Sequence, residues 1–217
     1  MIDEQTEKPR RSSFWRELPI LVTVAIVVAV LVRAFVLQTF YIPSGSMEHT
    51  LNIWDRVLVN KLVYDFRDPH RGEIIVFKAP SLWQHGDEGQ DFIKRIIGVP
   101  GDRVTCCDAQ HRLSINGHVL DEPYIYRDAD GVQEPAADTN FDITVPPGRL
   151  WVMGDHRLES GDSLENYKDT GGDIQKSTIP EDSVVGRAFT IFWPVSRAHW
   201  LSVPDGYDDI PDPPAAK

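Results

Sequence analysis

The sequence predicts a mainly β domain that follows one N-terminal membrane-spanning helix. An apolar run near the N-terminus has the length of a bilayer span, and short runs of β-branched and aromatic residues dominate the rest of the 217-residue chain. This length suits one anchor and one compact core. We expect a cytoplasmic tail over residues 1–17, an anchor over 18–38, a β domain over 39–203 and an acidic, proline-rich tail over 204–217 that is disordered or loosely docked.

The anchor is predicted from the apolar residues 20–37, with Arg33 near the far end, where it can reach the membrane interface. A cleaved secretory signal is the alternative. Its cleavage site needs small residues, whereas bulky residues such as Phe40 and Tyr41 follow the run. Because arginines flank the first end, the positive-inside rule puts residues 1–17 in the cytoplasm and the β domain on the other side.

Charge is unevenly distributed along the chain. Residues 1–17 hold four basic and four acidic residues, so the net charge of −11 falls on the residues after them. A domain this acidic repels a phosphate backbone, and we therefore expect no nucleic acid among its partners.

Strands are predicted from short runs with β propensity, and helices after residue 40 are expected to be few and short. The runs are 57–62, 73–77, 92–97, 143–145, 150–153 and 184–193, with a hairpin turning at Asn116-Gly117. Residues 127–140 and 168–175 are polar insertions that we expect to be surface loops. The adjacent Cys106 and Cys107 predict no structural disulfide, because their Cα atoms lie about 3.8 Å apart across a trans peptide; a vicinal disulfide is the alternative.

A turn that carries Ser46 follows the anchor, in the stretch 41–51. Pro43 restricts the backbone on both sides of its own peptide bond, and Gly45 allows a turn closed to other residues. A serine needs a base to become a nucleophile, and an ordinary surface turn is the alternative interpretation. Since Ser46 lies nine residues after Leu37, it stays within about 30 Å of the end of the anchor.

Lys94 lies inside an apolar strand that ends in the turn Gly98–Asp102. A solvated lysine has a pKa of about 10.4, and burial lowers that value by up to about 3–5 units, enough to give a neutral amine near pH 7. The alternative is a lysine that reaches solvent from a strand edge. The stretch 153–163 is a turn rich in hydrogen-bonding groups after a strand, and a surface pair of Asp155 with Arg157 is its simplest interpretation. The stretch 54–61 is predicted to return the chain to the sheet.

Taken together and in this order, these stretches resemble the bacterial type I signal peptidases, which are membrane-bound Ser/Lys endopeptidases. The residues that carry the resemblance are Pro43-Ser44-Gly45-Ser46-Met47, Thr50-Leu51, Lys94-Arg95, Gly98, Pro100-Gly101-Asp102, Gly154-Asp155, Arg157, Ser160 and Asp162-Ser163. They cover the chain from about Phe40 to Trp193. The resemblance implies antiparallel sheets coiled into barrel-like layers.

Roles at the site follow from the resemblance. Ser46 is implied as the nucleophile and Lys94 as the general base, with the Ser44 hydroxyl and the Ser46 N–H as oxyanion donors. Ser160 is implied to orient Lys94, and the residues implied to support the site are Arg95, Asp155, Arg157 and Asp162. No metal or cofactor is implied. The implied substrates are secretory preproteins with small residues before the cleaved bond, and the implied location is the bacterial plasma membrane, with one span and an extracytoplasmic catalytic domain.

Three positions depart from the family pattern: His49, His156 and Leu164. His49 also raises an alternative base, with Asp55 or Asp155 as its partner. Two other functions remain open: a Ser/Lys processing or self-cleaving peptidase of the same fold group, and a non-catalytic β-domain adaptor tethered to the membrane.

Overall fold

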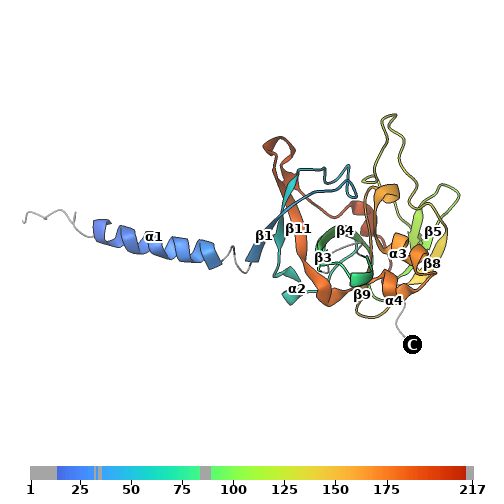
Figure 1. Ribbon diagram of the computed structural model, residues 1–217, viewed down its shortest axis with the longest axis horizontal. Helices are drawn as coiled ribbons and strands as arrows, with labels where there is room; N and C mark the ends of the chain where they lie inside the picture. Colours follow the sequence, from blue (N-terminus) through green and yellow to red (C-terminus); the bar gives the residue numbers. More distant parts are fainter. Residues whose placement is uncertain (1–13, 32, 34–35, 84–88, 214–217) are drawn as a thin grey trace, which may run out of the picture. The chain divides into compact units, whose positions relative to one another are not determined.

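The computed structural model describes residues 14–31, 33, 36–83 and 89–213. The chain divides into two units, residues 1–37 and residues 38–217. In the first unit, helix α1 spans Phe14–Leu31 (Figure 1). Its apolar side chains, for example Ile20 and Val30, are exposed.

The N-terminal expectations are only partly covered. Residues 1–13 of the expected tail lie outside the described residues. A helix both long and apolar enough for a bilayer span is not found among the described residues. The last two residues of the expected anchor, Leu37 and Gln38, belong to the first strand instead of the helix.

Most of the second unit is built from two β-sheets. The order of the large sheet is β1 (Leu37–Tyr41), β2 (Arg56–Asn60), β11 (Val184–Trp193), β3 (Ile74–Lys78), β4 (Asp91–Gly98), β9 (Arg149–Met153) and β10 (Ile179–Pro180), and β12 (His199–Trp200) also pairs with β11. The order of the small sheet is β7 (His118–Val119), β6 (Leu113–Ile115), β5 (Arg103–Cys106) and β8 (Phe141–Thr144). Figure 1 shows β11 toward one end of this unit and β5 and β8 at the other.

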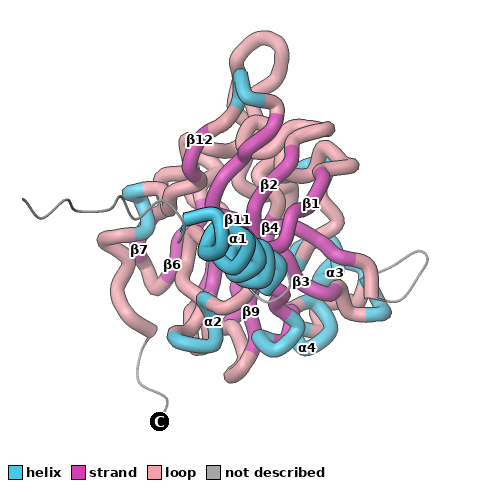
Figure 2. Tube along the Cα trace, turned by 90° about the vertical axis from the view of Figure 1, so that its left-hand side faces the viewer, coloured by secondary structure: helices cyan, strands magenta, loops and turns pink. Residues whose placement is uncertain are grey.

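Bulges curl the large sheet. Pairing of β11 with β2 shifts register between Ala188 and Thr190 and again between Ile191 and Trp193. An extra residue in one strand bends it and increases its twist. The long strand β11 therefore curves around β3 and β4 (Figure 1), and Figure 2 shows the small-sheet strands β6 and β7 beside this curled sheet. The mainly β, antiparallel fold predicted from the sequence is confirmed.

All six predicted strands and the Asn116-Gly117 hairpin are present. The helices of the second unit are short, as expected: α2 (Val63–Phe66), α3 (Ser163–Asp169) and α4 (Ile174–Ser177). The segment 168–175, expected to be a loop, contains the end of α3 and the start of α4. Each of these helices has an aspartate N-cap, Asp162 for α3 and Asp173 for α4, which accepts hydrogen bonds from the first turn.

Side-chain alternation along β3 builds hydrophobic clusters on both faces of the large sheet. Ile74 and Val76 belong to one cluster, and Ile75 and Phe77 belong to another. A third cluster lies between the small sheet and neighbouring segments, including Trp151 of β9. The large sheet is thus covered on both sides, which makes it a rigid support for the site.

The C-terminal tail is packed as far as residue 213, which corrects the expectation of disorder. Tyr207 and Ile210 are only 6% and 7% exposed and belong to the third cluster. The Pro211 carbonyl accepts hydrogen bonds from Asn116 and Arg71. The prediction from composition was wrong because two buried apolar residues hold an otherwise polar segment against the core.

Cys106 and Cys107 form a vicinal disulfide across a cis peptide bond, with Cα atoms 3.0 Å apart. The expectation of no disulfide was wrong, because the argument assumed a trans peptide between the two residues.

Candidate active site

The turn that carries Ser46 is fixed by buried side chains on either side of it. Met47 and Leu51 are fully buried in the cluster formed with β2, β3 and β11. The Leu51 N–H donates to the Met47 carbonyl at 2.7 Å. The end of the loop is closed by Asp55, whose carboxylate accepts the Asn52 N–H at 2.8 Å. Ser46 is therefore held at a defined position although it lies in a loop.

Strand β4 brings Lys94 to this serine. The Lys94 Nζ lies 2.5 Å from the Ser46 Oγ. Both residues are buried, with Lys94 4% and Ser46 8% exposed. Burial lowers the pKa of Lys94 to about 8, against the opposing effect of the negative charges of Asp162 and Asp155. The alternative, in which Lys94 reaches solvent from the edge of a strand, is therefore wrong.

A cleft of about 720 Å³ opens onto this pair. Its lining includes Ser44 and Gly45 beside Ser46, and the β4 residue Phe92 beside Lys94. Ser44 is exposed at this cleft. An extended peptide that enters the cleft would thus bring a carbonyl group to the Ser46 hydroxyl.

Asp155 and Arg95 form a buried ion pair beneath the site, although a surface pair of Asp155 with Arg157 was the simplest interpretation. The Arg95 Nε and Nη2 donate to the two Asp155 oxygens at 2.8 and 2.6 Å. Thr50, from the Ser46 turn, donates to the same carboxylate at 2.5 Å. The Arg95 guanidinium also lies 4.0 Å from the centre of the Tyr124 ring. This pair ties the Ser46 turn to β4.

Arg157 has its own buried partner. Its guanidinium contacts the Glu122 carboxylate at 2.5 and 3.2 Å and donates to the carbonyls of Gly154 and Ala136. Glu122 also accepts from the Tyr124 hydroxyl at 2.7 Å. Arg157 therefore secures the loop after β9 to the segment that follows β7.

Asp162 and Ser160 are buried in the same loop after β9, and the charge of Asp162 acts on Lys94. One Asp162 oxygen accepts the Gly154 N–H at 2.9 Å, and the other accepts the Leu164 N–H at 2.9 Å. Burial raises the pKa of Asp162. The buried Ser160 hydroxyl opposes this rise through its interaction with the Asp162 carboxylate. The expected hydrogen bond from Ser160 to Lys94 is not formed among the described residues. A Cβ at Gly154 would overlap Ser160 and the Ser46 carbonyl, so this position requires glycine.

The alternative base, His49, points elsewhere. Its Nδ1 lies 3.0 Å from the Tyr124 carbonyl. Its suggested partners are occupied too, because Asp55 binds Arg197 at 3.0 Å and Asp155 binds Arg95. The geometry pairs Ser46 with Lys94 instead.

Several supporting residues were not predicted from the sequence. Glu122, Tyr124, Arg197 and Tyr207 come from segments with no motif, and the Tyr124 and Tyr207 hydroxyls lie 2.5 Å apart. Each is a charged or aromatic residue without a local motif, and its partner is distant in the sequence, 35 residues away for Glu122 with Arg157 and 83 for Tyr124 with Tyr207. Such long-range contacts cannot be read from the sequence.

The chain is similar to known proteins along most of its length. The family model described as "Signal peptidase, peptidase S26" matches residues 15–193. The chain is 38% identical to the probable signal peptidase I-2 of Synechocystis sp., over 93% of this chain and 85% of that protein. It is 34% identical to signal peptidase I of Mycobacterium tuberculosis, over 89% of this chain and 78% of that protein. A crystal structure of signal peptidase I from Enterococcus faecalis aligns with 30% identity and a TM-score of 0.42, over 56% of this chain and 97% of that one.

The family match spans most of the chain, and relatives above 30% identity extend along nearly all of it. The stretches that carry Ser46, Lys94 and Asp155 all lie inside the matched range. The chain therefore belongs to the signal peptidase family, peptidase S26.

Proposed function

We propose that this protein is a membrane-anchored signal peptidase I, a serine endopeptidase that removes N-terminal signal peptides from secretory preproteins. In this proposal Ser46 is the nucleophile and Lys94 the general base. The observation that carries it is the 2.5 Å contact between a buried lysine amine and a serine hydroxyl at the floor of a cleft. Family membership supports the reaction class.

The reaction is acyl transfer. Neutral Lys94 takes the proton from the Ser46 hydroxyl, and the serine oxygen attacks the substrate carbonyl carbon. The protonated Lys94 then gives its proton to the leaving amine as the peptide bond breaks. A water that is deprotonated by the same lysine hydrolyses the acyl-enzyme, which releases the second product and restores Ser46.

The oxyanion of each tetrahedral intermediate needs donors beside Ser46. The Ser46 backbone N–H donates to no acceptor within the described part of the chain, and Ser44 lines the cleft next to it. We assign these two groups as the donors. Ser160 is assigned to orient Lys94 once substrate is bound, and Arg95, Asp155, Arg157 and Asp162 are assigned to hold the surrounding loops in place.

Location belongs to the same proposal. The apolar run that begins at residue 20 and ends before β1 is assigned as a single span of the bacterial plasma membrane, with the N-terminus cytoplasmic and the β unit outside. Among the described residues of the β unit, the exposed tyrosine and tryptophan side chains are Tyr41, Trp54, Trp193 and Trp200. They come from β1, β11, β12 and the loop before β2, which are neighbours in the large sheet. Tyrosine and tryptophan favour the membrane interface, so this edge suits substrates held at a bilayer.

The test is cleavage of a preprotein by the detergent-solubilised full chain. One cut after a small-x-small sequence is expected. Ser46→Ala should abolish it, and Lys94→Ala should reduce its rate by at least about 10²–10⁴-fold, the usual contribution of a general base. Ser202→Ala and Lys176→Ala change the same residue types at exposed positions and should cleave at the normal rate.

The other outcomes separate the remaining functions. Cleavage of the chain itself without cleavage of the preprotein would favour a self-cleaving or processing peptidase. No cleavage by a folded protein would favour a membrane-tethered adaptor. Normal activity of Lys94→Ala together with an inactive His49→Ala would transfer the role of base to His49.

A further inference from the structure

We infer that His156 is a positioning residue that orients the oxyanion-binding N–H of Ser46. This inference rests on the proposed function, because it concerns the same reaction. His156 is one of the positions that depart from the family pattern, and it lines the cleft. Its ring contacts the backbone next to the nucleophile, whereas the Ser46 hydroxyl is paired with the Lys94 amine.

His156 makes two contacts with the backbone on either side of the Ser46 residue. Its Nδ1 lies 3.2 Å from the Gly45 carbonyl oxygen, and its backbone N–H donates to the Ser46 carbonyl at 3.2 Å. The Gly45 carbonyl and the Ser46 N–H belong to one planar peptide unit and point in opposite directions. A donor that holds the carbonyl on one side therefore fixes the direction of the N–H on the other.

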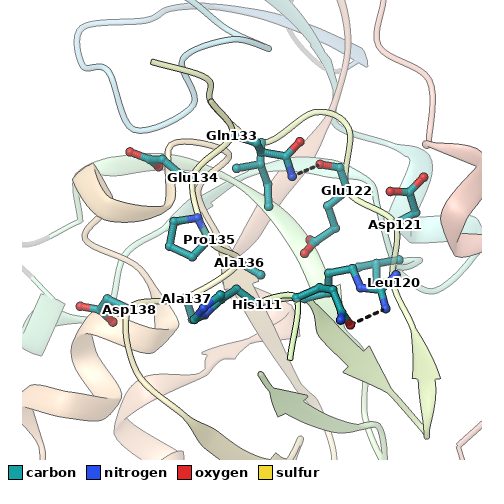
Figure 3. A pocket seen from close by; sticks show the side chains of 13 residues that line it. His111, Leu120, Asp121, Glu122, Gln133, Glu134, Pro135, Ala136, Ala137 and Asp138 are labelled. Carbon is teal, nitrogen blue, oxygen red and sulfur yellow. Dashed lines mark hydrogen bonds between the residues drawn. The ribbon is translucent and has the colours of Figure 1, made fainter. Parts of the chain in front are cut away.

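The imidazole is itself held from the opposite side by the insertion 127–140 and the residue before it. The ring stacks on Tyr126, with centroids 3.9 Å apart and planes 16° apart. Its Nε2 lies 3.3 Å from a Glu134 oxygen, and the Glu134 backbone N–H donates to the Tyr126 carbonyl at 3.0 Å. The insertion also lines a pocket, and Figure 3 shows the Glu134 carboxylate turned away from that pocket. The insertion thus acts as a brace for His156.

The hydrogen bond assigned to the ring is the one that the Nδ1–H donates, because the Gly45 carbonyl can only accept. Nδ1 faces the Gly45 carbonyl, with a Glu48 oxygen at 3.5 Å, and Nε2 faces Glu134. A second donor to the Gly45 carbonyl is the Glu48 N–H, at 2.8 Å. Removal of the Nδ1 donor would therefore loosen the peptide unit between Gly45 and Ser46 without releasing it.

Three substitutions separate these contacts. His156→Asn puts an amide nitrogen close to the place of Nδ1 and keeps the donor to Gly45. His156→Gln keeps a polar group near Nε2 only, and His156→Phe keeps only the stacking on Tyr126. We expect kcat of the Asn variant to stay within about threefold of the wild type, and kcat of the Gln and Phe variants to fall about tenfold, less than the loss of a whole oxyanion donor. KM should change by less than about twofold in all three, because Nδ1 acts on the transition state.

A second measurement does not depend on cleavage. Hydrogen exchange of the Ser46 amide, followed by NMR in the full-length detergent-solubilised chain, should be faster in the Phe and Gln variants than in the wild type and unchanged in the Asn variant. Equal exchange in all four proteins, or a loss of kcat in the Asn variant as large as in Phe, would overturn the inference. A wild type that cleaves no better than Ser46→Ala would instead overturn the proposed function, while the exchange rates would still decide the role of His156.

Discussion

At the scale of single residues, the chemistry depends on the cost of burying one amine. Lys94 is surrounded by the β4 and β3 core, and burial opposes its positive charge more strongly than Asp162 and Asp155 support it. The pKa of about 8 leaves roughly one lysine in ten neutral at pH 7, against about one in a few thousand for a solvated lysine. The same amine is thus a usable base near neutrality.

The first prediction is the pH dependence of cleavage. Since only the neutral amine accepts the Ser46 proton, kcat/KM should rise with pH and level off above a midpoint near 8. The measurement is kcat/KM on a short peptide substrate between pH 6 and pH 10. A rate that is constant from pH 6 to pH 10 would contradict Lys94 as the base.

The second prediction concerns stability. The pKa of Lys94 in the folded protein lies below the ordinary lysine value of 10.5, so the native state binds its proton less tightly than the unfolded state. Below pH 8 this lowers the free energy of unfolding by about 3 kcal/mol, and the penalty disappears as pH rises from 8 to 10.5. Lys94→Met, which removes the charge, should therefore be more stable than the wild type at pH 7, by an amount that shrinks toward pH 10.5.

Urea unfolding of both proteins at pH 7 and pH 10 measures that difference. The exposed Lys176→Met serves as the control and should show no comparable pH-dependent gain. A Lys94→Met variant that is less stable than the wild type at both pH values would contradict the burial cost inferred here.

Motif residues could be found from the sequence because the chemistry limits their type, and the structure brings Ser46 and Lys94 together. Their roles stay predictions. Partners such as Glu122 for Arg157 could not be found, because any acidic residue in a polar loop would satisfy the same guanidinium. Ser160 shows a second limit, since its implied bond to Lys94 is not formed in this structure.

At the scale of elements, long apolar runs were predictable and short edge elements were not. Strand β4 was evident because four apolar residues flank Lys94 and Arg95, two on each side. The strands β10 and β12 are two residues long, and β1 was hidden within the end of the apolar run assigned to the anchor. Pairing with a neighbour, and not local sequence preference, makes these segments strands.

The C-terminal segment shows the same limit for loops. Its proline and aspartate content indicates disorder, yet Tyr207 packs against Gly72, whose φ of +80° and close neighbours leave no room for a side chain. The Tyr207 hydroxyl contacts that of Tyr124, which in turn lies against Arg95. The segment therefore reaches the buried network under the site.

The third prediction tests this packing. Ile210→Ala should lower the free energy of unfolding by about 2–4 kcal/mol, because Ile210 is buried in the third cluster. Val132→Ala, at a position that is 62% exposed, should change it by less than about 0.5 kcal/mol. Urea denaturation measures both values. Equal, negligible effects would show that the segment does not pack in solution.

At the scale of the whole molecule, the β unit carries its own core. The three hydrophobic clusters draw on residues from Phe40 to Ile210, and every assigned catalytic or supporting residue lies among them. The first unit contributes α1, whose apolar side chains are exposed in this structure. Folding and chemistry are therefore expected to reside in residues 38–217, and the proposed anchor is expected to supply location.

The fourth prediction follows from the separate roles expected for residues 1–37 and 38–217. A chain that begins at Gln38 should unfold at nearly the same urea concentration as the full-length protein, because it keeps all three clusters. Its kcat/KM on a short soluble peptide should stay within about threefold, since the Ser46–Lys94 contact involves no residue of the first unit. Cleavage of a preprotein inserted in vesicles should fall by about 10²-fold or more, because tethering enzyme and substrate to one membrane raises their effective concentration.

Ser46→Ala in the same shortened chain gives the background rate of cleavage. Loss of peptide cleavage in a shortened chain that still unfolds cooperatively would mean that residues 1–37 take part in the chemistry, and equal cleavage of the inserted preprotein by both chains would remove the role assigned to the anchor.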